Sequence, residues 1–244
     1  MEQPIKDAPR ETSIENFIKL KPPSIPEGFN GSFTECGFDP SKYSDSLFSQ
    51  LDIPIPVQIA GSVTKRKAEF LAGRYCAKAA LSELGYFHTP VAIGHNRCPA
   101  WPAGISGSIS HSENRAVCVV SRNFQGVGID ITHKIPGKII SEINTSILNK
   151  NEEDICKSYA DPTQDGVTLI FSMKEALFKA LYPQVKKYFD FLDVEVVAID
   201  PKKQKIQLRL IRDLSEKLGA GTEFIGSYWK TGECFYSLLE YGPR

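Results

Sequence analysis

Residues 116–131, AVCVVSRNFQGVGIDI, decide how this chain is organised. The two apolar runs, AVCVVSR and GVGIDI, are rich in β-branched residues, and the turn residue Asn123 lies between them. This pattern predicts two β-strands joined by a short turn. On each side of the turn, a helical pattern precedes strand patterns. The sequence therefore predicts two domains of mixed α+β structure, at 1–122 and 123–244.

The first half contains one strongly helical segment, TKRKAEFLAGRYCAKAALSELG at 64–85. Its apolar residues recur at helical spacing, Gly85 ends it, and Ser62 or Thr64 is expected to cap its start. Residues 1–60 are rich in Pro, Ser and Phe, and their prolines favour edge strands and loops over helices.

The second half is expected to contain a weak helical stretch at 138–158, a loop at 161–166 and a strong helix, TLIFSMKEALFKALY, at 168–182. Four strands follow, DVEVVAID, KIQLRLI, TEFIGSYWK and ECFYSLLEY, at 193–200, 205–211, 222–230 and 233–241. No internal repeat is visible, so the sequence does not by itself indicate a duplication.

The composition is that of a globular protein. The chain has 244 residues, 41% of them hydrophobic, which is enough for a full-size core and excludes disordered and fibrous classes. Lys and Arg (29) balance Asp and Glu (29), so no overall charge attracts nucleic acid or a membrane. No apolar run reaches the roughly 18 residues of a membrane span. With no secretory signal at the start and six scattered cysteines, we expect a cytoplasmic protein with reduced thiols.

The helix at 64–85 opens with the basic run Lys65-Arg66-Lys67 and carries Arg74 and Lys78 further along. Cations near a helix N-terminus act together with its free backbone N–H groups to bind phosphate. Ser110 and His111, which follow a Gly-Ser-rich turn, could add hydrogen bonds to phosphate oxygens. The alternatives are a solvated basic face for the helix and a turn or packing role for the histidine.

In GVGIDIT, strand alternation sends Asp130 to the face opposite Ile129 and Ile131. With a second carboxylate nearby, Asp130 would be a magnesium ligand, because Mg²⁺ prefers hard oxygen donors. The candidate is Glu175, which shares a helix face with Lys179. Such a pair often decorates an exposed helix, where it contributes only about 0.2–0.5 kcal/mol. Here, however, its neighbours in FSMKEALFKA are mostly apolar, which predicts a buried helix and a ligand for the charges.

Taken in order, RKAEFLAGR, PAWP with GSISHS, GVGIDI and FSMKEALFKA resemble the successive motifs of the 4'-phosphopantetheinyl transferases, in the branch of enterobactin synthetase component D and its surfactin-type relatives. The resemblance runs from Arg66 to Asp193. It implies a monomer of two similar α+β halves related by a pseudo-twofold axis. Coenzyme A would lie between an N-terminal nucleotide side and a C-terminal half with the metal site and catalytic helix.

The resemblance also assigns roles to residues. Asp130 and Glu175 correspond to the magnesium-binding acids, and Lys179 to a lysine on the pyrophosphate. The coenzyme A phosphates would be held by a further set, Arg66, Arg74, Arg97, Ser110 and His111. Many relatives have a third acid two residues after the aspartate, where this chain has Thr132. The remaining Mg²⁺ positions would then fall to water, the Thr132 hydroxyl or the Ile131 carbonyl.

The implied activity is magnesium-dependent transfer of the 4'-phosphopantetheine arm of coenzyme A to a serine of an apo acyl or peptidyl carrier protein, with release of 3',5'-ADP. Asp130, Glu175 and Lys179 would form the catalytic set. The implied pathways are siderophore, nonribosomal peptide, polyketide or fatty-acid synthesis. Two other functions stay open, a metal-dependent hydrolase or acyltransferase that uses coenzyme A, and a silent module that binds carriers or nucleotides.

Overall fold

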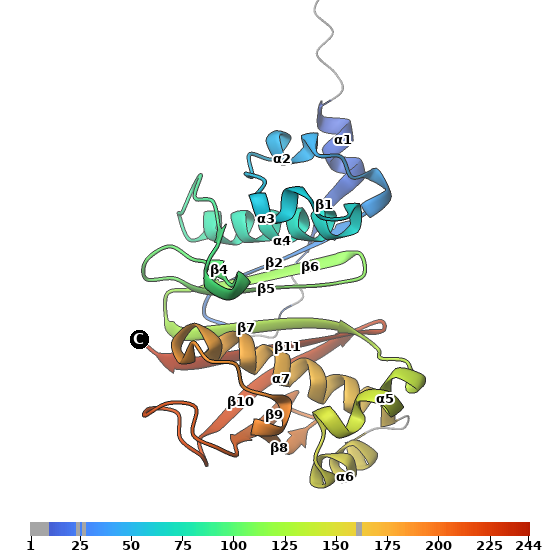
Figure 1. Cartoon of the computed structure of the whole chain (residues 1–244), viewed down its shortest axis with the longest axis vertical. Helices are drawn as coiled ribbons and strands as arrows, with labels where there is room; N and C mark the ends of the chain where they lie inside the picture. The colour runs from blue at the N-terminus through green and yellow to red at the C-terminus, as the bar shows by residue number, and fades with distance from the viewer. Residues whose placement is uncertain (1–9, 23–24, 26–27, 160–162) are drawn as a thin grey trace, which may run out of the picture.

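The computed structural model describes residues 10–22, 25, 28–159 and 163–244, and these form two halves, each with its own antiparallel sheet (Figure 1). The elements of the first half are α1 (Arg10–Phe17), β1 (Ile18–Lys21), β2 (Ser32–Phe38), α2 (Ser46–Gln50), α3 (Val57–Ala60), α4 (Thr64–Glu83), β3 (Ala92–Ile93), β4 (Pro99–Ala100), β5 (Ser106–Ser112) and β6 (Arg115–Ser121). Short 3-10 turns lie at Pro40–Lys42 and His95–Arg97.

The N-terminal sheet has the strand order β1-β2-β6-β5, and α4 packs on one of its faces. Small residues on the buried side of α4, among them Ala68, Ala72 and Cys76, are fully buried. They bring the helix close to β2 and β6, because small side chains let the two backbones approach. Gly85, at φ +81°, directly follows the C-cap residue Leu84, so it ends the helix in the left-handed conformation that glycine tolerates.

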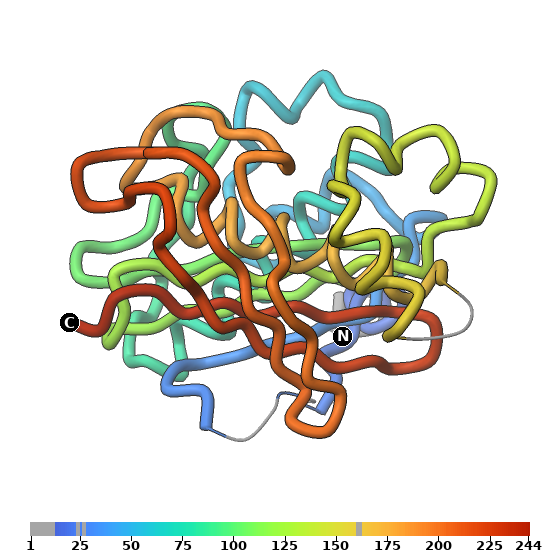
Figure 2. Tube along the Cα trace, turned by 90° about the horizontal axis from the view of Figure 1, so that it is seen from below, coloured from blue at the N-terminus to red at the C-terminus, as the bar shows by residue number. Residues whose placement is uncertain are grey.

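The second half continues with β7 (Phe124–His133), α5 (Gly137–Ile147), α6 (Lys150–Tyr159), α7 (Thr163–Val185), a 3-10 turn at Phe191–Asp193, β8 (Val194–Asp200), β9 (Lys205–Leu210), β10 (Glu223–Thr231) and β11 (Cys234–Pro243). Its sheet has the order β7-β11-β10-β9-β8, and the long helix α7 packs against β7 and β11. Figure 2 shows α5 and α6 gathered on one side of this half, opposite the chain's C-terminus.

The two halves meet where β5 and β6 pack against β7. Apolar side chains from both sheets form a shared cluster there, with Val117 and Val119 on β6 and Ile129 on β7. A polar contact accompanies this cluster, since the hydroxyl of Ser106 donates a hydrogen bond to the carbonyl oxygen of Phe124 at 2.9 Å. The two sheets are therefore joined by a continuous core.

The mixed α+β architecture with two sheet-containing halves, the helix at 64–85 and the four C-terminal strands are confirmed. Several details of the sequence analysis are wrong. The helical stretch at 138–158 is two helices, α5 and α6, and α7 already begins at Thr163. Of the loop expected at 161–166, residues 161 and 162 lie outside the described residues.

Three further corrections concern the first half. Residues 10–60 contain β1 and β2 but also α1, α2 and α3, with Pro56 as the N-cap of α3, a position that tolerates proline. The N-cap of α4 is Val63, without a side-chain hydrogen bond, so neither Ser62 nor Thr64 caps it. The Gly-Ser-rich turn expected before Ser110 is instead part of the strand β5, which runs from Ser106 to Ser112.

The six cysteines are free thiols, five of them buried. Within the part of the chain that the structure describes, none of the helices combines the length and apolar character needed to cross a bilayer.

Candidate active site

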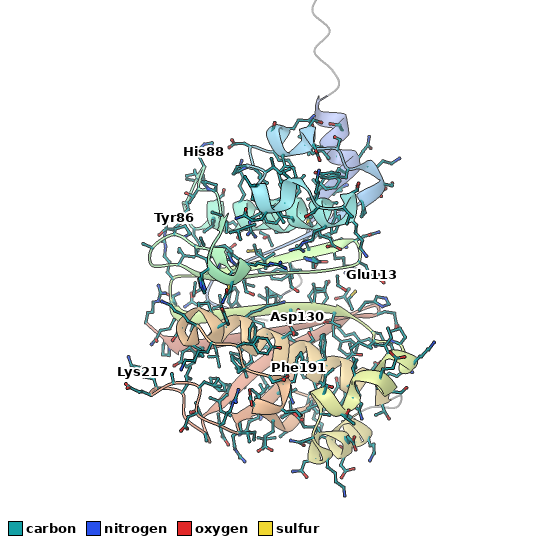
Figure 3. The ribbon with its side chains drawn as sticks, viewed as in Figure 1. Tyr86, His88, Glu113, Asp130, Phe191 and Lys217 are labelled. Atoms are coloured by element: carbon teal, nitrogen blue, oxygen red, sulfur yellow. The ribbon has the colours of Figure 1, made fainter. Side chains whose placement is uncertain are left out.

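Asp130 lies on β7 at the junction of the two halves, and the residue is only 5% exposed (Figure 3). Its Oδ1 accepts hydrogen bonds from Lys179 Nζ at 2.6 Å and Ser110 Oγ at 2.8 Å. Its Oδ2 accepts from Thr132 Oγ1 at 2.5 Å and Ser172 Oγ at 2.9 Å. Strands β5 and β7 and helix α7 therefore all supply donors to this one carboxylate.

These contacts decide the charge of Asp130. Burial alone would raise its pKa. The charge of Lys179 and the hydrogen bonds from Lys179, Thr132 and Ser110 outweigh burial, so the pKa lies below its ordinary value. Asp130 is therefore an anion at neutral pH.

Two glycines of β7 explain how α7 comes so near. A Cβ atom at Gly128 would overlap the carbonyl oxygen of Ala176, and one at Gly126 would overlap that of Ala180. Both carbonyls belong to α7, so the helix backbone rests directly on the strand. This close approach brings Lys179 to Asp130.

Glu175 lies one turn before Lys179 on the same face of α7 and lines the same pocket of about 420 Å³ as Asp130, Thr132 and His111. Burial raises the pKa of Glu175, the charge of Lys179 opposes this rise, and the charge of Asp130 adds to it. Among the described residues, no side-chain hydrogen bond or ion pair to the Glu175 carboxylate is found. A partly buried carboxylate without a protein partner is suited to a cation or a proton.

A second pocket of about 440 Å³ adjoins the first, and both are lined by Ile109 and His111 of β5. The predicted cations Arg66, Arg74 and Arg97 all line this second pocket. The structure thus brings the predicted site residues together around two pockets that share Ile109 and His111, with the acids and Lys179 lining one and the arginines lining the other.

Arg66 Nη1 lies 3.1 Å from His111 Nε2, which accepts the hydrogen bond when the imidazole is neutral. Burial lowers the pKa of His111, and the charges of Arg66 and Lys179 lower it further, while Glu69 and Asp130 oppose the shift. Neutral His111 and the charged Arg66 therefore face the pocket together.

Arg74 is the most buried cation of the two pockets, at 7% exposure. Burial lowers its pKa to about 10, which still leaves it charged at neutral pH. Its guanidinium lies 4.5 Å from the centre of the Phe70 ring, and its Nε has no hydrogen-bond partner among the described residues. A buried cation with an unsatisfied N–H is suited to an anionic ligand.

Other cations noted in the sequence lie elsewhere. Lys67 pairs with Asp45 at 3.1 Å, and Lys78 pairs with Asp52 at 3.1 Å. These two lysines do not line the pocket of Arg66 and Arg74. The sequence analysis also missed Ser172 as a donor to Asp130; its position in the FS pair before the KE motif is the signal that could have found it.

The donor set fits a magnesium ion in part. Asp130 and Glu175 offer hard oxygens to one pocket, and Thr132 adds a hydroxyl. Within the described chain, no group of three or more His, Cys, Asp and Glu side chains that could hold a metal is found. Mg²⁺ commonly keeps several waters and binds one or two protein carboxylates plus substrate phosphates, and two acids satisfy that requirement.

Comparison with known families identifies both halves. The family profile described as 4'-phosphopantetheinyl transferase N-terminal domain matches residues 56–121. The profile of the 4'-phosphopantetheinyl transferase superfamily matches residues 126–228. Between the two matches lie residues 122–125, which comprise the turn after β6 and the first two residues of β7.

Individual proteins are similar to this chain as well. Enterobactin synthase component D of Escherichia coli K12 is 37% identical over 161 residues, 66% of this chain and 75% of that protein. Its counterpart in Salmonella typhi is 38% identical over 148 residues, 61% of each chain. The 4'-phosphopantetheinyl transferase Svp of Streptomyces mobaraensis is 29% identical over 177 residues, 72% of each chain. The chain belongs to the 4'-phosphopantetheinyl transferase superfamily, in the branch of the enterobactin synthase component D proteins, and is an enzyme of that class.

Proposed function

We propose that this enzyme takes the 4'-phosphopantetheine arm from coenzyme A, with Mg²⁺ as cofactor, and transfers it to a serine of an apo carrier protein with release of 3',5'-ADP. The main support is the pair of adjoining pockets, because the two acids and a lysine line one, three arginines line the other, and His111 lines both. Coenzyme A carries a nucleotide with a 3'-phosphate on one side of its pyrophosphate and an uncharged arm on the other. This arrangement matches the distribution of charged side chains.

The arginine end would hold the nucleotide. Arg66 and Arg74 donate to the 3'-phosphate, and the buried position of Arg74 strengthens its charge-assisted hydrogen bonds, since the local dielectric is low. Arg97, Ser110 and His111 would contact the remaining phosphates. Each such bond contributes about 1.5–3 kcal/mol.

The acid end would carry out the transfer. The carrier serine oxygen forms a bond to the phosphorus that bears the pantetheine arm, and the bond from that phosphorus to the oxygen of 3',5'-ADP breaks. Glu175 would accept the serine proton, directly or through water. Lys179 donates to the departing phosphate. Asp130 and Glu175 would hold Mg²⁺, which would offset the negative charge of the pyrophosphate.

The pathway is inferred from the relatives. Because the similar proteins include enterobactin synthase components, we expect the carrier to be a peptidyl carrier of siderophore synthesis. An enterobactin synthase complex, a cytoplasmic location and a monomeric state are expected on the same ground.

The proposal is tested by incubating the enzyme with coenzyme A and a panel of apo carriers from siderophore, polyketide and fatty-acid synthases, with Mg²⁺ or with a chelator. The intact mass of the carrier is measured. We expect the mass of one phosphopantetheine group to be added only when Mg²⁺ is present, and fastest on the siderophore carrier. Hydrolysis of coenzyme A without a change in carrier mass would instead support the hydrolase alternative.

A second test separates the arginine end from the acid end. Arg66→Ala should raise the KM for coenzyme A by roughly tenfold or more, the loss of one charge-assisted bond. The same variant should leave the KM for dephospho-coenzyme A, which lacks the 3'-phosphate, nearly unchanged. An equal loss with both donors would contradict the assignment of Arg66 to the 3'-phosphate.

A further inference from the structure

The loop at 94–98 brings Arg97 into the anion pocket in an unfavourable backbone conformation. Asn96 and Arg97 both have positive φ angles, +49° and +66°. Asparagine adopts this left-handed region readily, but arginine does so rarely. A hydrogen bond from Gly94 N to the Cys98 carbonyl at 2.7 Å closes the loop on itself. Such a conformation persists when surrounding contacts hold it.

One of those contacts comes from the other half of the molecule. The side-chain amide of Asn96 donates a hydrogen bond to the hydroxyl of Tyr182 on α7. Tyr182 is 8% exposed, and its ring packs on that of Phe178 with ring centres 5.2 Å apart, so the hydroxyl is held in place.

Tyr182 belongs to the same face of α7 as the acid end of the site. Glu175, Lys179 and Tyr182 follow at steps of four and three residues, which places them in one row along the helix. Among the described residues, no hydrogen bond or ion pair of the Arg97 side chain itself is found. The position of its guanidinium therefore depends on the backbone of the loop.

We propose that Tyr182 is a positioning residue for coenzyme A: through Asn96 it holds Arg97 in the conformation that presents the guanidinium to the pocket of Arg66 and Arg74. The inference rests on the proposed function, in which Arg97 contacts a coenzyme A phosphate. It adds that α7, which carries the acids, also sets the shape of the arginine end.

The test compares Tyr182→Phe, which removes the hydroxyl and keeps the ring, with Tyr241→Phe. Tyr241 also packs on an aromatic ring, that of Phe224, and lies outside both pockets. For Tyr182→Phe we expect the KM for coenzyme A to rise about three- to tenfold, the loss of one hydrogen bond, with kcat and the KM for the carrier nearly unchanged. Asn96→Ala, on an exposed loop, should likewise raise the KM for coenzyme A and leave kcat and the KM for the carrier nearly unchanged. Tyr241→Phe should behave like the wild type.

A double-variant cycle shows whether Tyr182 acts through Arg97. In an Arg97→Ala background, Tyr182→Phe should have no further effect on the KM for coenzyme A. An equal rise in both backgrounds, an unchanged KM in the single variant, or a fall in kcat alone would overturn the inference.

The outcomes also separate the inference from the proposed function. If Arg97→Ala raises the KM and Tyr182→Phe does not, the proposed function stands and the inference is wrong. If Arg97→Ala leaves the KM unchanged, the role of Arg97 in coenzyme A binding is wrong and the inference fails with it.

Discussion

Glu175 lies in an environment that disfavours its charged form when no ligand is bound. Burial raises the pKa of its carboxyl, so ionisation at neutral pH costs folding free energy. We predict that Glu175→Gln abolishes transfer but is at least as stable as the wild type when Mg²⁺ is absent. Thermal unfolding at pH 7 measures this, and a gain of 1 kcal/mol would raise the Tm by roughly 2–4 °C.

The gain should depend on pH in a defined direction. Below the ordinary pKa of glutamate the carboxyl is protonated in both the folded and unfolded states, and the two proteins should unfold alike. As the pH rises through the raised pKa of the folded state, the wild type should become relatively less stable. Glu142→Gln, an exposed acid on α5, serves as the control. A stability difference that grows toward acid pH would contradict this account.

At the scale of elements, the site depends on how closely α7 rests on β7. Gly128→Ala would place a methyl group on the carbonyl oxygen of Ala176, so helix and strand must separate. We expect a loss of about 3 kcal/mol, the upper range for over-packing, and a Tm lower by roughly 6–12 °C. Transfer activity should fall by more than the loss of folded enzyme explains, because Lys179 and Glu175 move away from Asp130.

The control for Gly128→Ala is Gly61→Ala. A Cβ at Gly61 would meet no heavy atom within 4 Å, and its φ of −87° suits alanine. This variant should keep the wild-type Tm and activity. A Gly128→Ala enzyme with normal Tm and activity would show that the close approach does not position the site.

Strand β5 could not be predicted from its local sequence. Its Gly and Ser content indicates a turn, yet Ser106, Ser108 and Ser110 alternate along a strand and turn their hydroxyls toward β7. The S-x-S-x-S spacing carries the period of two, but serine is not a usual residue for a buried strand. Here the hydroxyls donate hydrogen bonds to carbonyl and carboxylate oxygens of the other half. These partners cannot be recognised from the local sequence.

Strands β6 to β11 and α7 could be predicted because their apolar periodicity is strong. The placement of Asp130, on a strand, in one pocket with Glu175 and Lys179, on a helix, was indicated by the resemblance to the family and not by periodicity. The hydrogen bond of Asn96 could not be predicted at all, since its partner Tyr182 comes from the opposite half.

At the scale of the whole molecule, the two halves should unfold together, because the cluster around Val119 and Ile129 belongs to both sheets. We predict one calorimetric transition whose calorimetric and van't Hoff enthalpies agree. Leu71→Ala in the N-terminal core and Leu208→Ala in the C-terminal core should each cost about 2–5 kcal/mol and lower that same transition. Two transitions, each moved by only one of the variants, would show that the halves are independent.

The central claim is that Asp130 and Glu175 hold one divalent ion that the transfer needs, and direct titration with Mn²⁺ in the presence of coenzyme A tests it. Calorimetry should find one ion per chain in the wild type and in Glu142→Gln. Affinity should be weaker by at least about tenfold in both Asp130→Asn and Glu175→Gln. Wild-type affinity in either of these two variants would contradict the account.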